Sequence, residues 1–188
     1  MTTGLLRTIP VTVAVANALA SFDGATETGD NMGEFINWLQ KPFGAIGKPW
    51  CGCAVNRGGR VALGALWPIP DDVGAGCQAM HDWAKAHGCL SEAPELHAIA
   101  LFWHEKVQGG PRYAHTGYVI QVHPADAKGR IAITSWEGNT NADGSREGKK
   151  FMKKTRVVGP KDCFILWWLA LAAPVTDTRA TPAPAVPR

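Results

Sequence analysis

Hydrophobic residues recur at helical spacing through the first half of the chain and predict four helices there. The predicted helices cover residues 11–22, a segment starting at Asn31, a segment starting near Trp50-Cys51, and residues 76–87. Gly24 is expected to stop the first helix, and Glu34 stands where it would complete an approximate capping box with Asn31. Gly58-Gly59 is expected to weaken or end the third helix, whereas Gly88 suits the C-terminal cap of the fourth.

The second half of the chain changes to short apolar runs separated by turn residues, a pattern that indicates strands. Strands are predicted over residues 97–103, 116–122, 131–136 and 163–171, with turns at 109–111 and 126–129 and a loop at 139–148. Helices followed by an antiparallel sheet give an α+β domain, which we place at residues 1–173. Residues 174–188 are Pro-rich and lack aromatic side chains, so we expect a disordered tail.

Charge excludes some classes of partner. The net charge is +3, and the basic residues gather only in 149–156. We interpret that run as a solvated turn or strand edge, with attraction to an anionic cell wall as the alternative. Residues 11–20 superficially resemble a signal peptide, but Pro10 and Asn17 interrupt them and favour a structural helix. The apolar run at 163–173 is shorter than the about 20 residues that a membrane helix needs. We therefore expect no nucleic-acid partner and no membrane span.

The five cysteines do not suggest a disulfide framework, because their number is odd and the chain is not small. Cys51 and Cys53 form a C-x-C pair, which lacks the two-residue gap of a redox or zinc motif. Cys77, Cys89 and Cys163 lie on apolar patterns and are expected to be buried thiols. No metal and no cofactor are expected.

Cys51 stands where a thiol can become a nucleophile. A thiol attacks as a thiolate, and the free N–H groups at a helix start favour that charge. His115 precedes a predicted strand and is the candidate base that takes the thiol proton and returns it to a leaving amine. A third polar group must orient the imidazole, and Glu137 or Asn139, just past the strand at 131–136, stands in a suitable place.

Three short motifs carry a resemblance to a known family. Pro49-Trp50-Cys51, residues 115–119 (His-Thr-Gly-Tyr-Val) and residues 137–141 (Glu-Gly-Asn-Thr-Asn) resemble, in this order, the motifs of CHAP domains. These are cysteine, histidine-dependent amidohydrolases/peptidases of the papain-like NlpC superfamily. Residues 27–33, 78–88 and 144–148 resemble supporting segments of the same family, so the resemblance spans roughly residues 11–172.

The resemblance implies a papain-like fold and a role for each motif residue. Cys51 is the implied nucleophile, and its backbone N–H is implied to help stabilise the oxyanion. His115 is the implied general base and then acid, Glu137 orients and charges it, and Asn139 is a further polar member of the site.

Some positions add to this pattern or depart from it. Trp50 and Trp136 flank the motifs and are expected to bind substrate as walls of the cleft. Cys53 and Gly58-Gly59 depart from the small apolar residues that usually follow the nucleophile, and residues 96–99 lack the Gly-Asp that often precedes the histidine strand. Some CHAP lysins bind calcium through acidic loops. Asp23, Glu27 and Asp30 are too scattered to predict such a site here.

The implied function is peptidoglycan hydrolysis through a thioester acyl-enzyme, as an N-acetylmuramoyl-L-alanine amidase or an endopeptidase. The expected partner is bacterial peptidoglycan, and the expected state is a monomer. The expected place of action is the bacterial cell wall, reached by secretion or through a phage holin-type route, as for an endolysin. Two alternatives stay open: a papain-like enzyme that cleaves another amide, and a non-enzymatic virion or cell-wall module.

Overall fold

The computed structural model describes residues 10–141 and 148–171. The helices are α1 (Val11–Ala20), α2 (Glu34–Gln40), α3 (Cys51–Leu63), α4 (Cys77–Ala86) and α5 (Trp168–Leu171), with 3-10 turns η1 (Lys41–Phe43) and η2 (Gly64–Leu66). The strands are β1 (Leu90–Ser91), β2 (Ile99–His104), β3 (Arg112–Val122), β4 (Ala132–Thr140), β5 (Lys150–Val157) and β6 (Cys163–Ile165).

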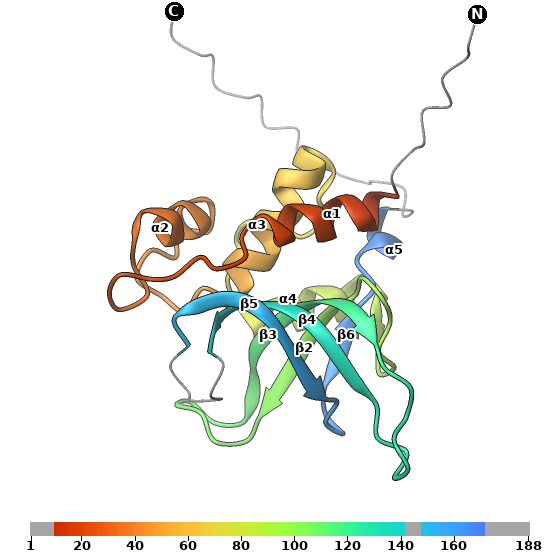
Figure 1. Ribbon diagram of the computed structural model, residues 1–188. Helices are drawn as coiled ribbons and strands as arrows, with labels where there is room; N and C mark the ends of the chain where they lie inside the picture. The colour runs from red at the N-terminus through yellow and green to blue at the C-terminus, as the bar shows by residue number, and fades with distance from the viewer. Residues whose placement is uncertain (1–9, 142–147, 172–188) are drawn as a thin grey trace, which may run out of the picture.

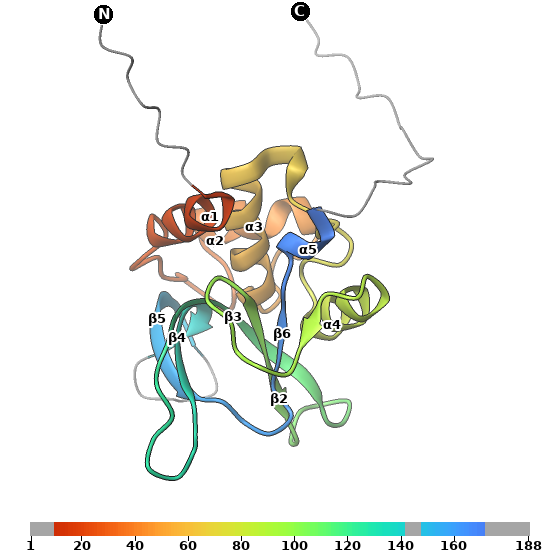
Figure 2. The same ribbon diagram turned by 90° about the vertical axis from the view of Figure 1, so that its right-hand side faces the viewer.

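The six strands form one antiparallel sheet in the order β1-β6-β2-β3-β4-β5. Figure 1 shows α1, α2 and α3 together on one side of this sheet, and Figure 2 shows α4 apart from α1 and α2, on the side of β6. Helix α4 packs against β3. The larger hydrophobic core joins α1, α3 and α4 to the sheet, and a smaller one contains alternate residues of β2, including Ala100 and Phe102. The expected α+β class, with helices mostly before the strands, is confirmed.

Helix α3 does not end at Gly58-Gly59, contrary to the expectation from sequence. A Cβ at Gly58 would lie 2.4 Å from a methyl carbon of Leu19 on α1, and one at Gly59 would lie 2.2 Å from the Trp67 ring. The two glycines let α1 and an aromatic ring reach the backbone of α3. Close packing there offsets the low helix propensity of glycine, and α3 continues to Leu63.

Helix α2 begins at Glu34, later than predicted. Asn31 has a φ of 55°, outside the helical region, and Gly33 with a φ of 138° precedes the helix without a side-chain cap. The expected capping box is therefore wrong. Met32 precedes the helix and is 47% exposed, whereas Ile36 and Leu39 within it are fully buried.

The strands differ from the predicted ones mainly in length. Strand β3 starts at Arg112 and β4 continues to Thr140, so the candidate residues of both motifs lie within strands. The apolar run from Cys163 is a strand only to Ile165, because the chain then turns into α5. The prediction missed β1 and β5. The basic run forms β5 at the sheet edge, which confirms its interpretation as a strand edge.

The N-terminal segment that superficially resembles a signal peptide forms a structural helix, as its sequence favours. Residues 11–20 form α1, which buries Val15 and Leu19 in the main core. The tail at 174–188 and residues 142–147 of the predicted loop lie outside the described residues. In the segments that the structure describes, no helix has the length and apolar character needed to cross a membrane.

Candidate active site

Cys51 is the first residue of α3, directly after Trp50. The first N–H groups of a helix have no partner within the helix, and they favour a negative charge beside them. The backbone N–H of Gly52 donates a hydrogen bond to the Cys51 sulfur. The Cys51 side chain also lines an open cleft of about 390 Å³, so this buried thiol lies beside solvent-accessible space.

Gly52 fixes the surroundings of this helix start. A Cβ at Gly52 would lie 2.8 Å from the backbone oxygens of both Gly74 and Ala75, so only glycine allows these segments to approach so closely. The Asn56 side chain links α3 to the loop at Gly74, because its amide donates to the carbonyl oxygens of Gly52, at 3.0 Å, and Gly74, at 2.8 Å. The loop that leads to Cys77 is thereby held against α3.

His115 and Glu137 meet across strands β3 and β4. The Nε2 atom of His115 lies 2.7 Å from a carboxylate oxygen of Glu137. Gly117 makes room for this pair, because a Cβ there would lie 2.7 Å from the Glu137 Cγ atom and 3.0 Å from Ser135. The imidazole also stacks on Phe102 of β2 with ring centroids 5.8 Å apart. The glycine of the His-Thr-Gly motif thus has a steric reason.

Glu137 is fully buried and held as a carboxylate by three neighbours. Arg156 of β5 donates from Nε at 2.9 and 3.1 Å and from a terminal nitrogen at 2.8 Å, and the Ser135 hydroxyl donates at 2.9 Å. Burial alone raises the pKa of Glu137, but hydrogen bonds from His115 and Arg156 and their charges outweigh it and lower the pKa to about 2. Glu137 is therefore ionised at neutral pH.

The electrostatics favour an imidazolium–thiolate pair. Burial lowers the pKa of His115, but hydrogen bonds to Cys51 and Glu137 and their charges raise it to about 9. Hydrogen bonding from the Cys77 thiol lowers the pKa of Cys51; burial raises it, and His115 lowers it further, so that it lies well below the ordinary value. With Nε2 bound to Glu137, Nδ1 is the nitrogen left for the thiol proton.

Cys53 has the opposite character. It is fully buried, and burial followed by the charge of Cys51 raises its pKa to about 12. Two positions along a helix correspond to a rotation of about 200°, which separates the two side chains of the C-x-C pair. Cys53 belongs to the main hydrophobic core and is a neutral packing residue.

Trp50 and Trp136 do not form walls of the cleft, contrary to the expectation from sequence. Trp50 is fully buried and donates from Nε1 to Glu27 at 3.0 Å, and Trp136 is 4% exposed and stacks on Phe151. Gly138 brings the first of these rings against β4, because a Cβ there would lie 2.7 Å from Trp50. Both indoles belong to the main hydrophobic core, and neither lines the cleft beside Cys51.

Asn139 lies in β4 beyond Glu137, at an irregularity in the pairing with β5. Its φ of 53° is in the left-handed region, which asparagine tolerates better than most residues. Among the described residues, its side chain makes no hydrogen bond to His115, Glu137 or Cys51. The Nε2 atom of the imidazole is bound by Glu137, and Asn139 lies next to the last residue of β4.

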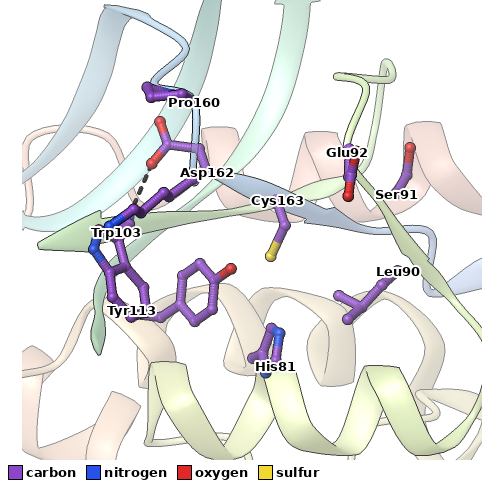
Figure 3. A pocket seen from close by; sticks show the side chains of 10 residues that line it. His81, Leu90, Ser91, Glu92, Trp103, Tyr113, Pro160, Asp162 and Cys163 are labelled. Carbon is purple, nitrogen blue, oxygen red and sulfur yellow. Dashed lines mark hydrogen bonds between the residues drawn. The ribbon is translucent and has the colours of Figure 1, made fainter. Parts of the chain in front are cut away.

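The cleft beside Cys51 is basic and extends toward a second cavity. Its charged lining residues, within the described part of the chain, are Lys48 and Arg112. A neighbouring cavity of about 410 Å³ shares Tyr113 with the cleft. Figure 3 shows Tyr113 and the Cys163 sulfur directed into this second cavity, with His81 of α4 below them. The cleft and the second cavity both lie between α4 and the sheet.

Sequence reasoning missed three side chains of this site. Arg156 was hidden in the basic run, Ser135 in an apolar strand, and Cys77 among the buried thiols. The alternation of Phe151 with polar residues was the available signal for β5, but it does not reveal which strand lies beside it. Cys77 carried no signal, because only the fold brings its Sγ atom to 3.8 Å from that of Cys51.

Comparisons with family models, with curated proteins and with solved structures gave no significant match to this chain. Over residues 10–141 and 148–171, no group of three or more His, Cys, Asp or Glu side chains is arranged to hold a metal ion.

Proposed function

We propose that this protein is a cysteine amidohydrolase or peptidase that hydrolyses bacterial peptidoglycan. The observation that carries the proposal is the chain of contacts from a thiol at a helix start, through His115, to the buried carboxylate of Glu137. A thiol that only packs in a core has no use for an imidazole beside it or for a buried ion pair behind that imidazole. The arrangement therefore supports an enzyme over a binding module.

Acylation begins with the Cys51 thiolate attacking the amide carbonyl carbon. The carbonyl oxygen becomes an oxyanion, and the backbone N–H of Cys51, the first residue of α3, stabilises it in this scheme. His115 then gives its Nδ1 proton to the amide nitrogen, the C–N bond breaks, and the amine leaves. The product is a thioester between the acyl group and Cys51.

Deacylation uses the same groups with water in place of the amine. Neutral His115 takes a proton from water as the water attacks the thioester carbonyl carbon. The C–S bond breaks, Cys51 leaves as a thiolate, and His115 is again an imidazolium. Glu137 does not contact the substrate in this scheme. It holds the imidazole in position and stabilises its charged form.

Two features support a wall peptide as the substrate. The motifs around Cys51, His115 and Glu137 resemble those of CHAP domains, and Lys48 and Arg112 line the cleft. Stem peptides of peptidoglycan carry free carboxylates, which cations at the rim attract. A papain-like enzyme acting on another carboxylate-bearing amide is the second candidate, since the same cations suit it.

The proposal is tested with purified bacterial walls as substrate. We expect the wild-type protein to release soluble muropeptides, and Cys51→Ala and His115→Ala each to abolish this release while circular dichroism stays native. Cys53→Ala is the matched control, because it removes a nearby thiol outside the site and should keep most of the activity. Turnover by a folded Cys51→Ala protein would refute the assignment of the nucleophile.

The same digestion identifies the bond. Mass spectrometry of the released fragments distinguishes cleavage between the lactyl group and L-Ala from cleavage within the stem or bridge peptide. Walls left intact by a protein whose Cys51 reacts rapidly with iodoacetamide would favour the second candidate substrate class.

A further inference from the structure

Cys51 has a second thiol as its neighbour. Its Sγ atom lies 3.8 Å from that of Cys77, which is the first residue of α4. Both side chains line the same cleft, and both cysteines are free. A disulfide holds its sulfur atoms about 2.05 Å apart, so the two Sγ atoms must approach each other by about 1.8 Å to bond.

The backbone around the pair is built to keep the two helix starts together. Gly52 allows the oxygens of Gly74 and Ala75 to approach α3, and Asn56 ties Gly52 to Gly74. These contacts lie one residue after Cys51 and a few residues before Cys77. Bond formation therefore starts from two helix ends that are already held next to each other.

The two thiols also differ in the way that a nucleophile and its resolving partner differ. Cys51 is the sulfur stabilised as a thiolate, whereas hydrogen bonding to Cys51 and burial raise the pKa of Cys77 and keep it protonated. Peroxide reacts with a thiolate, so oxidation starts at Cys51 and leaves the Cys77 thiol intact.

We propose that Cys77 is the resolving thiol of Cys51, and that oxidation by a peroxide joins the two in a reversible disulfide that blocks the nucleophile. The Cys51 thiolate attacks hydrogen peroxide, the O–O bond breaks, and with one proton the products are Cys51 sulfenic acid and water. The Cys77 thiol then attacks the sulfenic sulfur, the S–O bond breaks, and a second water leaves as the disulfide forms. A small dithiol reverses this by becoming oxidised itself, which returns both thiols.

The consequence for activity rests on the proposed function, whereas the disulfide itself does not. The pair acts as a redox switch that holds the site inactive under oxidising conditions and protects Cys51 from irreversible sulfinic acid. Without a resolving thiol, the sulfenic acid remains open to a second oxidation.

The test treats the full-length protein with hydrogen peroxide and then with dithiothreitol. Peptide mapping without reduction should find Cys51 cross-linked to Cys77, and the protein should be lighter by two hydrogen atoms. Wall hydrolysis should be lost with peroxide and largely restored by dithiothreitol. Cys77→Ser, judged against its own untreated activity, should recover at least about tenfold less, because its Cys51 proceeds to sulfinic acid.

Cys53→Ala is the matched control and should behave as the wild type, since Cys53 is fully buried and does not line the cleft that Cys51 and Cys77 line. Sulfinic acid on wild-type Cys51 with Cys77 still open to alkylation would overturn the inference, as would full recovery of Cys77→Ser. Peptide mapping needs no substrate, so a missing wall hydrolase activity leaves this test intact. Conversely, hydrolysis without the cross-link refutes the switch alone.

Discussion

Replacing Glu137 with Gln isolates the contribution of one buried charge to the reactivity of Cys51. The substitution keeps the size of the side chain but removes the charge that His115 and Arg156 share. The fall of the pKa of Glu137 from 4.5 to about 2 corresponds to roughly 3 kcal/mol in favour of the ionised form, at about 1.4 kcal/mol per pH unit. Burial opposes this shift, so the favourable interactions with His115 and Arg156 together exceed it.

A hydrogen bond to a charged group is typically worth about 1.5–3 kcal/mol, and we expect the His115–Glu137 contact to lie in that range. Its loss lowers the pKa of His115 from about 9 and raises that of Cys51, so less of the imidazolium–thiolate pair exists at neutral pH. We expect kcat/KM for wall hydrolysis to fall about 10- to 100-fold. The alkaline limb of the pH profile should also move from near pH 9 to lower pH.

Alkylation of Cys51 by iodoacetamide measures the same effect without a substrate. The wild-type rate should already be high near neutral pH, and Glu137→Gln should need a higher pH to reach it. Glu105→Gln is the matched control, because Glu105 forms an exposed pair with Lys161 away from the site. An unchanged alkylation profile together with an unchanged alkaline limb would refute the reasoning and move the orienting role to another group, such as Asn139.

Three further predictions address the surroundings of this charge. Gly117→Ala should displace the Glu137 side chain, since the new Cβ would lie 2.7 Å from its Cγ atom. It should lower stability by about 1–3 kcal/mol, measured by thermal unfolding, and disturb the His115–Glu137 contact, measured by the alkylation profile of Cys51. An alkylation profile like that of the wild type would contradict this prediction. Arg156→Met should lower the free energy of unfolding by about 1–3 kcal/mol at neutral pH. Because the pKa of Glu137 is depressed in the folded state, that stabilisation is present above pH 4.5 and is lost as the pH falls toward about 2. The free energies of unfolding of the two proteins, measured by denaturant titration, should therefore converge as the pH falls through this range. A difference that does not depend on pH would assign the loss to packing alone. Lys48→Gln combined with R112Q should raise KM for substrates with a free carboxylate but not for their amidated forms, with kcat little changed, and an equal effect on both substrates would exclude charge recognition.

The sequence alone predicts the order of the elements and identifies the motif residues. Helix α4 and the start of α3 follow from spacing and from the position of Cys51. The sequence predicts a loop from residue 139, yet Asn139 lies within β4 at an irregular pairing, and Gly138 allows Trp50 to contact the backbone of that strand. Local patterns report the conformation that a residue favours, and they do not report which neighbour approaches it.

For the same reason, the sequence could not predict which side chains contact Glu137 and Cys51. Arg156 contacts Glu137 because β5 pairs with β4 in one particular register, with Glu137 opposite Met152. Cys77 meets Cys51 because two helix starts converge. Trp50 and Trp136 resembled cleft residues by their position beside the motifs, and only burial showed that they belong to the core.

The place of β6 in the sheet has a consequence for the way the chain folds. This strand is the last to be synthesised, yet it lies between β1 and β2, where Leu101 pairs with Cys163 and Leu90 with Ile165. Until the ribosome has released that segment, the outer edge of β2 has open backbone groups and β1 has no neighbour, an arrangement that invites pairing with other chains. Chains that stop before residue 163 should therefore aggregate, and cooperative folding of this domain should begin only after residues 163–165 have left the ribosome.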